Sequence, residues 1–175
     1  MPPIKGSEPA PHRQRGFTLL ELMITLAMMA MVAGISFAAS GWIEAHRLRM
    51  ETQALQQRLE GLRQLSVTTR SSWRLCPISE FGNTSECGDD WQAGYQWNTM
   101  NGNASRLAGR HEVDGVTLSW NAGGALAFNS APWQINGANG SFTLCNDSGS
   151  NKIIINDADR VRVEYDIGNC PPSDV

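Results

Sequence analysis

Glu21 is the residue whose setting most clearly requires a chemical explanation. It is the only ionisable side chain between Phe17 and Ile43, in a stretch dominated by Leu, Met, Ala and Ile. A carboxylate at the centre of a membrane-spanning helix costs about 3 kcal/mol on insertion scales, and such residues usually have a function or a partner. A buried acid is tolerated when it meets a cation. The position of Glu21 therefore indicates a positively charged partner.

Arg160 and Arg162 are the second candidate group. Residues two apart on a β-strand share a face, and guanidinium groups suit phosphate oxygens. Asp157, Asp159 and Glu164 are close in sequence. Two interpretations stay open: a phosphate-binding pair, or arginines that pair with these carboxylates on a solvated strand. Three further basic residues extend a patch only if the fold brings them together: Arg106, Arg110 and Lys152.

The four cysteines all lie in the C-terminal part of the chain, at positions Cys76, Cys87, Cys145 and Cys170. In an oxidising compartment an even number indicates two disulfides. Of the three connectivities we expect the local one, Cys76–Cys87 and Cys145–Cys170, each bridge contributing about 3 kcal/mol. A zinc site is disfavoured because the chain has no C-x-x-C pair.

Enzyme signatures are missing from the sequence. It has no G-x-S-x-G, H-E-x-x-H or P-loop motif. His12 and His46 lie near the N-terminal apolar stretch, and His111 is expected in a polar loop. None has a neighbouring cysteine or carboxylate pattern that suggests catalysis. We therefore expect a protein that is not an enzyme and needs no cofactor or metal.

The apolar stretch has the length of a membrane span. Leu22–Ile43 alone exceeds the roughly 20 residues needed. No proline occurs between Pro11 and Pro77, so one helix is permitted from about Phe17 to about Thr69, roughly 80 Å long. A signal peptide cleaved near residues 38–40 is disfavoured by the long N-terminal region, the long apolar run and Glu21. A plain single-span anchor explains the length but not Glu21.

The second half of this helix is predicted to be amphipathic and to pack on a β domain. Leu48, Leu55, Leu59, Leu62 and Ser66 recur at helical spacing and form its inward-facing stripe. Short segments rich in β-branched and aromatic residues follow, separated by Gly, Asn, Asp and Ser. We expect strands at 73–76, 95–98, 115–120, 126–128, 141–145, 152–155 and 161–165. The predicted fold is therefore α+β, a long helix on a small antiparallel β domain.

The charge of the chain is modest, with a net charge of −3. This gives no bulk argument for nucleic acid. The first 16 residues contain four prolines and are predicted to be disordered. Their basic residues, Lys5, Arg13 and Arg15, should keep the N-terminus in the cytoplasm. The cysteine-containing part then lies across the membrane.

The segment from Gly16 to Glu21, GFTLLE, resembles the type IV prepilin signal. The resemblance implies cleavage by a membrane peptidase between Gly16 and Phe17, and N-methylation of the new terminal Phe17. The apolar stretch is then retained as a helix that packs into a filament. Glu21 would neutralise the N-terminal ammonium of a neighbouring subunit and so set the register of the subunits.

The exported part is similar to the GspH/FimT branch of the pilin-like superfamily. The likeness rests on Leu75-Cys76, Cys87, Asp90-Trp91, Gly94-Tyr95, Phe142-Thr143-Leu144-Cys145, the 152–155 strand, Arg160-x-Arg162 and Cys170. In FimT-like minor pilins a Gly-Arg-x-Arg motif binds DNA during transformation. Here Asp159 replaces the glycine. The resemblance thus implies double-stranded DNA as a partner of Arg160 and Arg162, although the glycine of the motif is missing.

The expected organisation is a cleaved leader at 1–16, a helix at 17–70 with a transmembrane segment at 17–43, and an exported β-rich domain at 71–175. The expected function is a minor pilin or pseudopilin of a type IV pilus or type II secretion filament, with other pilins and prepilin peptidase as partners. It would cross the bacterial inner membrane once, with its C-terminal domain in the periplasm. The alternative is a membrane-anchored periplasmic β domain unrelated to filaments.

Overall fold

The computed structural model describes residues 17–79, 84–102, 104–130, 139–156 and 160–170, with the side chains of 35–40 left out. The chain forms two compact units, Met1–Ala39 and Ser40–Val175. Helix α1, Leu19–Thr69, belongs to both, and it confirms the expected helix of about 17–69. The helix ends where Arg70 takes a left-handed backbone conformation with φ of 52°. Such a residue commonly closes a helix, and the chain continues directly into the first strand.

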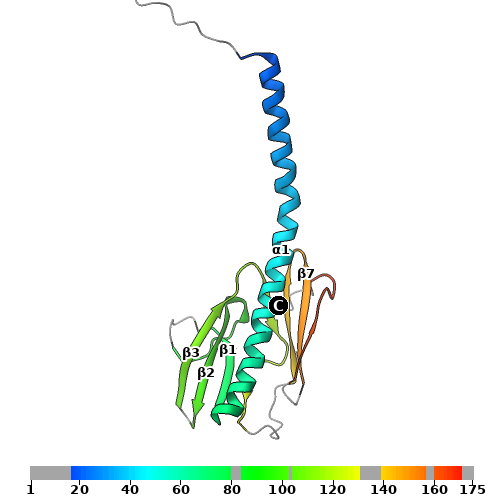
Figure 1. The fold of residues 1–175 in the computed structure, drawn as a ribbon. Coiled ribbons are helices and arrows are strands. Elements are labelled where there is room, and N and C mark those ends of the chain that lie inside the picture. Colours follow the sequence, from blue (N-terminus) through cyan, green and yellow to red (C-terminus); the bar gives the residue numbers. More distant parts are fainter. Residues whose placement is uncertain (1–16, 80–83, 103, 131–138, 157–159, 171–175) are drawn as a thin grey trace, which may run out of the picture. The chain divides into compact units, whose positions relative to one another are not determined.

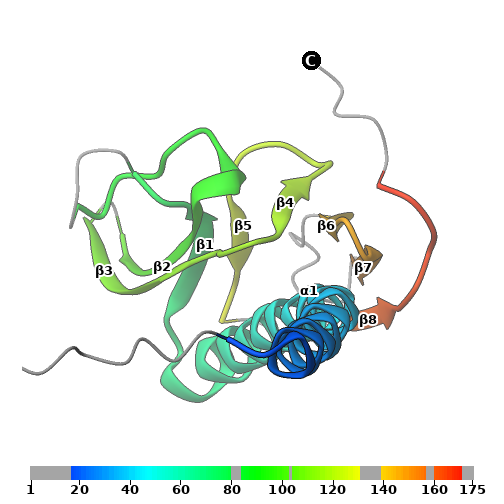
Figure 2. The ribbon, with the colours of Figure 1, turned by 90° about the horizontal axis from the view of Figure 1, so that it is seen from above.

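The second unit contains two four-stranded antiparallel sheets beside the C-terminal half of α1 (Figures 1 and 2). The first sheet has the order β3 (Ala104–Glu112), β2 (Gly94–Asn101), β1 (Ser72–Pro77), β5 (Leu126–Phe128). The second has the order β4 (Thr117–Trp120), β6 (Gly140–Asn146), β7 (Gly149–Ile155), β8 (Val161–Glu164). A short 3-10 helix, η1 (Trp91–Ala93), precedes β2. The α+β fold predicted from the sequence is confirmed.

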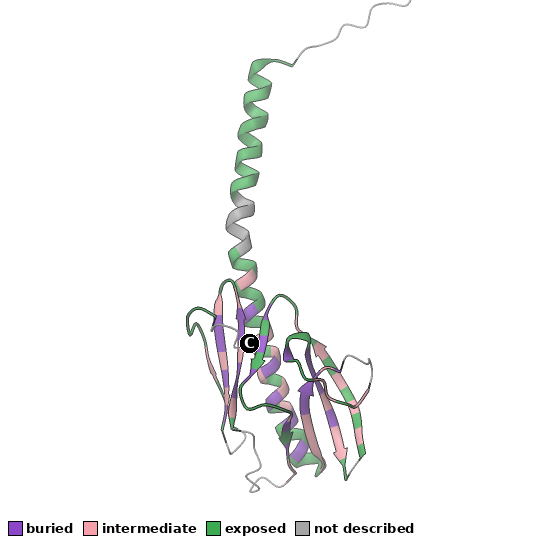
Figure 3. Ribbon diagram, turned by 180° about the vertical axis from the view of Figure 1, so that it is seen from behind, coloured by how far each residue is buried: buried purple, intermediate pink, exposed green. Residues whose placement is uncertain are grey.

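The apolar stripe of α1 faces the sheets. All five residues predicted for it are buried in the second unit: Leu48, Leu55, Leu59, Leu62 and Ser66. The four leucines join one core with apolar side chains from both sheets, including Leu75, Phe128, Phe142 and Ile153. Figure 3 shows buried residues recurring along the helix and along the central strands. Burying each leucine contributes about 1.5–3 kcal/mol, so this stripe holds the helix on the domain.

Polar contacts fix the register of α1 against the two sheets. Asn151 of β7 donates from Nδ2 to the buried hydroxyl of Thr52 at 2.9 Å. The Thr52 hydroxyl in turn donates to the Leu48 carbonyl at 2.6 Å. On the other sheet, Nε2 of His111 lies 2.8 Å from Oε2 of Glu51. A slide of the helix by one turn would break both contacts.

Strand β3 departs from the sequence prediction. We expected His111 in a polar loop, but it lies on β3, the edge strand of the first sheet. The segment 104–112 contains no Val, Ile or Thr, so it lacks the usual strand signal. The segment is held as a strand by tertiary contacts: it pairs with β2, and Gly109 lies close to the ring of Trp97.

Both predicted disulfides are present. Cys76–Cys87 joins β1 to the loop before η1, and Cys145–Cys170 joins β6 to the C-terminal segment. The Cα atoms are 5.6 Å apart in each bridge, a distance typical of disulfides. Each therefore closes a local loop of the second unit.

Candidate functional site

The start of α1 carries the first candidate site. The hydroxyl of Thr18 accepts a hydrogen bond from the backbone N–H of Glu21 at 3.3 Å. Thr18 is thus an N-cap, and Glu21 occupies the third helical position of a T-x-x-E capping pattern. Gly16 lies outside the described residues, and Phe17 is exposed. The sequence suggested a role for Glu21 between subunits, and the local cap, which the T-x-x-E spacing signals, was not among the predictions.

Apolar side chains of the first unit are exposed. Leu19, Met23, Met29 and Val32 each leave more than half of their surface accessible, as do several neighbours. No helix in the described part of the chain is long and apolar enough to cross a membrane. The transmembrane segment expected at 17–43 stays a prediction. That range includes 35–40, whose side chains lie outside the described residues.

Arg160 and Arg162 form the second candidate site, at the start of β8. Both are exposed. The Arg162 guanidinium forms an ion pair with Glu164, its neighbour on the same face of the strand. The backbone of Arg160 pairs with Asn156 through two hydrogen bonds of 2.9 and 3.2 Å. The described residues thus place one arginine in an ion pair and give the other none, while Asp157 and Asp159 lie outside them.

Of the three basic residues that could extend this patch, Lys152 alone lies beside the pair in the described part of the chain. Arg106 and Arg110 are on β3, which belongs to the other sheet, and Arg110 pairs with Glu112 at 3.2 Å. Lys152 lies on β7, in register with Glu164 of β8. The fold therefore keeps Arg106 and Arg110 away from the pair, whereas Lys152 shares a sheet face with Arg162 on the neighbouring strand.

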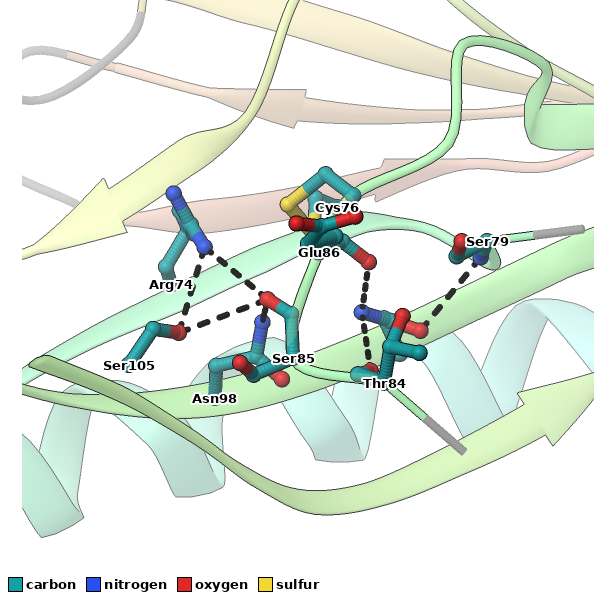
Figure 4. Close-up of a disulfide and its surroundings, with 10 residues drawn as sticks. Arg74, Cys76, Ser79, Thr84, Ser85, Glu86, Asn98 and Ser105 are labelled. Carbon is teal, nitrogen blue, oxygen red and sulfur yellow. Dashed lines mark hydrogen bonds between the residues drawn. A yellow bond between two sulfur atoms is a disulfide. The ribbon is translucent and has the colours of Figure 1, made fainter. Parts of the chain in front are cut away.

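A polar network surrounds the Cys76–Cys87 bridge (Figure 4). The carbonyl of Ser85 accepts hydrogen bonds from Arg74 at 3.3 Å and from Asn98 at 2.9 Å. The side-chain amide of Gln96 donates to the carbonyl of Glu86 at 2.7 Å. These bonds attach the loop closed by the disulfide to strands β1 and β2. The arrangement is structural, because these contacts link the loop to its own sheet, and Arg74 also donates to Ser105 of the same sheet.

Tyr95 is the one described residue with a clear shift in pKa. Burial raises the pKa of its phenol well above the ordinary value, and the nearby carboxylate of Glu51 adds to the shift, while Arg58 opposes it. Tyr95 is therefore neutral at physiological pH. Its ring lies 5.1 Å from that of His111 in the contact between α1 and the first sheet.

Family comparisons match most of the chain. The prokaryotic N-terminal methylation motif matches residues 11–37, and the type II transport protein GspH matches residues 51–159. No curated protein sequence matches this chain.

Two solved structures share the fold, both of the type IV minor pilin FimU of Pseudomonas aeruginosa. The first is 16% identical, covers 71% of this chain and 93% of that chain, and has a TM-score of 0.56. The second is 17% identical, covers 68% of this chain and 94% of that chain, and has a TM-score of 0.53. At these identities the likeness concerns the fold.

Proposed function

Because the chain belongs to the family of the type II transport protein GspH, we propose that it is a filament subunit, a minor pilin or pseudopilin assembled through its N-terminal helix. The observation that carries the proposal is the capped start of α1. There the methylation motif, Glu21 and a row of exposed apolar side chains occur together. Exposed apolar surface of this extent favours burial against lipid or other chains.

The proposed processing and assembly of the subunit follow from the same segment. A leader at 1–16 is removed by prepilin peptidase, and Phe17 becomes the methylated N-terminus. The helix at 17–70 anchors the chain in the inner membrane through residues 17–43, with the domain at 71–175 in the periplasm. During assembly Glu21 meets the terminal ammonium of a neighbouring subunit. The neutralised pair then fits into an apolar filament core.

Co-purification tests the assembly role. Filaments would be sheared or extracted from cells of the host, and the mature chain sought in them by immunoblotting. We expect the chain in filaments from the parent strain and its absence from filaments of a strain without prepilin peptidase. A processed chain that never co-purifies with filaments would favour the alternative, an anchored periplasmic β domain.

Binding of double-stranded DNA by Arg160 and Arg162 is a second candidate function. The exposure of both residues and the missing carboxylate partner of Arg160 among the described residues support it. The Arg162–Glu164 ion pair counts against it, since that guanidinium is already partly neutralised.

Charge reversal separates the two functions. Arg160→Glu with Arg162→Glu should abolish DNA binding that weakens steeply with salt, and should leave filament assembly intact. Arg106→Glu with Arg110→Glu, on the other sheet, is the matched control. A parent protein that binds no DNA even at low salt would rule out the second function alone.

A further inference from the structure

A groove opens in the second unit between the last turns of α1 and the start of β8. Its volume is about 560 Å³. Arg63, Val67 and Thr68 line it from the helix. Arg160, which precedes β8, and Val161, the first residue of β8, line it from the other side. The two walls come from segments far apart in sequence that line the same groove.

The groove is positively charged at both walls. Arg63 and Arg160 are exposed, and neither forms an ion pair within the described part of the chain. Among the described lining residues Glu60 is the one acid, and it accepts a hydrogen bond from the side-chain amide of Gln56 at 2.9 Å. Two arginines against one glutamate leave this lining with a charge of +1, so an occupant with carboxylates is favoured over a neutral or basic one.

Strand β8 presents an open edge at this groove. It is the last strand of its sheet and pairs with β7 alone among the described strands. An open edge offers backbone N–H and C=O groups to an extended peptide, and grooves beside such edges select its side chains. Val67 is 44% exposed and Val161 is half-buried, so they give alternate side chains an apolar contact.

We propose that this groove binds an extended segment of another polypeptide in which acidic and apolar residues alternate. Its backbone lies along β8, its carboxylates meet Arg63 and Arg160, and its apolar side chains contact Val67 and Val161. Duplex DNA could pair with the two arginines only. Its phosphate backbone has neither apolar side chains to contact the valines nor peptide groups to pair with a strand edge. The proposal concerns the second unit and is independent of filament assembly by the N-terminal helix.

Peptide binding to the full-length protein in detergent micelles tests the proposal. The probe is a fluorescently labelled peptide of alternating valine and aspartate, followed by anisotropy. Arg63→Glu combined with Arg160→Glu should weaken binding at least about tenfold, and added salt should weaken binding to the parent protein. Arg49→Glu, on an exposed part of α1 away from the groove, is the matched control and should bind like the parent.

Three further probes separate the contributions of strand pairing, charge and nucleic acid. A peptide N-methylated at alternate backbone positions should bind more weakly, since it cannot pair with an edge strand. A peptide with lysine in place of aspartate should not bind. The proposal is overturned if the parent protein fails to bind the aspartate peptide, or if the Arg63→Glu, Arg160→Glu variant binds it unchanged. It is also overturned if duplex DNA displaces the peptide and this displacement is lost in Arg162→Glu but unchanged in Arg63→Glu.

Discussion

Glu21 combines a local and a proposed intermolecular role in one residue. Its backbone N–H donates to the Thr18 hydroxyl, so this capping bond uses the backbone of Glu21 and not its carboxylate. That leaves the charged side chain available to a neighbouring subunit. A negative charge in the first turn is also favourable to the helix itself, by about 0.3–1 kcal/mol.

Glu21→Ala should therefore leave membrane insertion intact and reduce incorporation into filaments, because the ammonium of the neighbouring subunit loses its counter-ion. Glu21→Gln keeps the size and polarity without the charge and should show the same defect. Immunoblots of membrane and filament fractions measure both steps. Normal incorporation of either variant would count against the ion pair.

Thr52 is the residue of the helix stripe that the sequence analysis missed. Thr52→Val should lower the free energy of unfolding by about 1–3 kcal/mol, because the buried amide of Asn151 loses its acceptor. Thr68→Val removes a similar hydroxyl from the exposed face of the same helix and should change stability by less than about 0.5 kcal/mol. Denaturant titration of both variants checks the difference. Equal losses of unfolding free energy in the two variants would show that the Asn151–Thr52 hydrogen bond does not stabilise the fold more than an exposed one.

Tyr95 makes a prediction about alkaline stability. The pKa of its phenol is raised in the folded state, so the unfolded chain releases this proton first as pH rises. Stability should be unaffected below about pH 10, the ordinary tyrosine pKa, and should fall above it. Tyr95→Phe should remove that part of the fall, as measured by unfolding at a series of pH values. An identical alkaline decline in both proteins would contradict the assignment.

At the scale of elements, the Cys145–Cys170 bridge holds the C-terminal segment on the second sheet. Beside it, Ile167 donates its backbone N–H to Ser150 at 3.0 Å, and the hydroxyl of Ser150 donates to Gly168 at 3.0 Å. Removing the bridge with Cys145→Ser should cost about 3 kcal/mol and loosen this segment. Cys170→Ser removes the same bridge and should give the same shift in melting temperature. An unchanged melting temperature in both would mean that the bridge does not form in the protein.

The elements differ in how far the sequence could predict them. The stripe from Leu48 to Ser66 was predictable because helical spacing depends only on local sequence. Val116, Leu118 and Trp120 alternate as expected and are buried. The division of the strands into two sheets was not predictable, since it depends on pairings between distant segments. Tyr165 also lies beyond the end of β8 and is exposed, although its spacing had suggested a place in that strand.

The candidate sites show the same difference between features set by local sequence and features set by contacts between distant segments. Glu21 was recognisable because a single charge in an apolar stretch is visible in the sequence. The groove beside β8 was not, because Arg63 and Arg160 come together only when the helix packs on the sheet edge. The sequence likewise suggested Arg160 and Arg162 as a pair, whereas the structure gives Arg162 a carboxylate partner within its own strand.

At the scale of the whole molecule, the two units have different surfaces. The first unit exposes its apolar side chains, and the second buries an apolar core under a polar surface. A soluble domain needs only the second kind of surface. The exposed apolar surface of the first unit is explained if residues from Phe17 onwards are retained and packed against lipid or other subunits. This requires that the leader, and not the apolar stretch, is removed.

Mass spectrometry of the mature N-terminus, on protein isolated from membranes of its host, tests this claim most directly. The account predicts a chain that begins at Phe17 and carries one methyl group on its α-amino nitrogen. A chain that retains Met1, or one cut near Ala39, would contradict it, because the helix could not then take its proposed place in a filament.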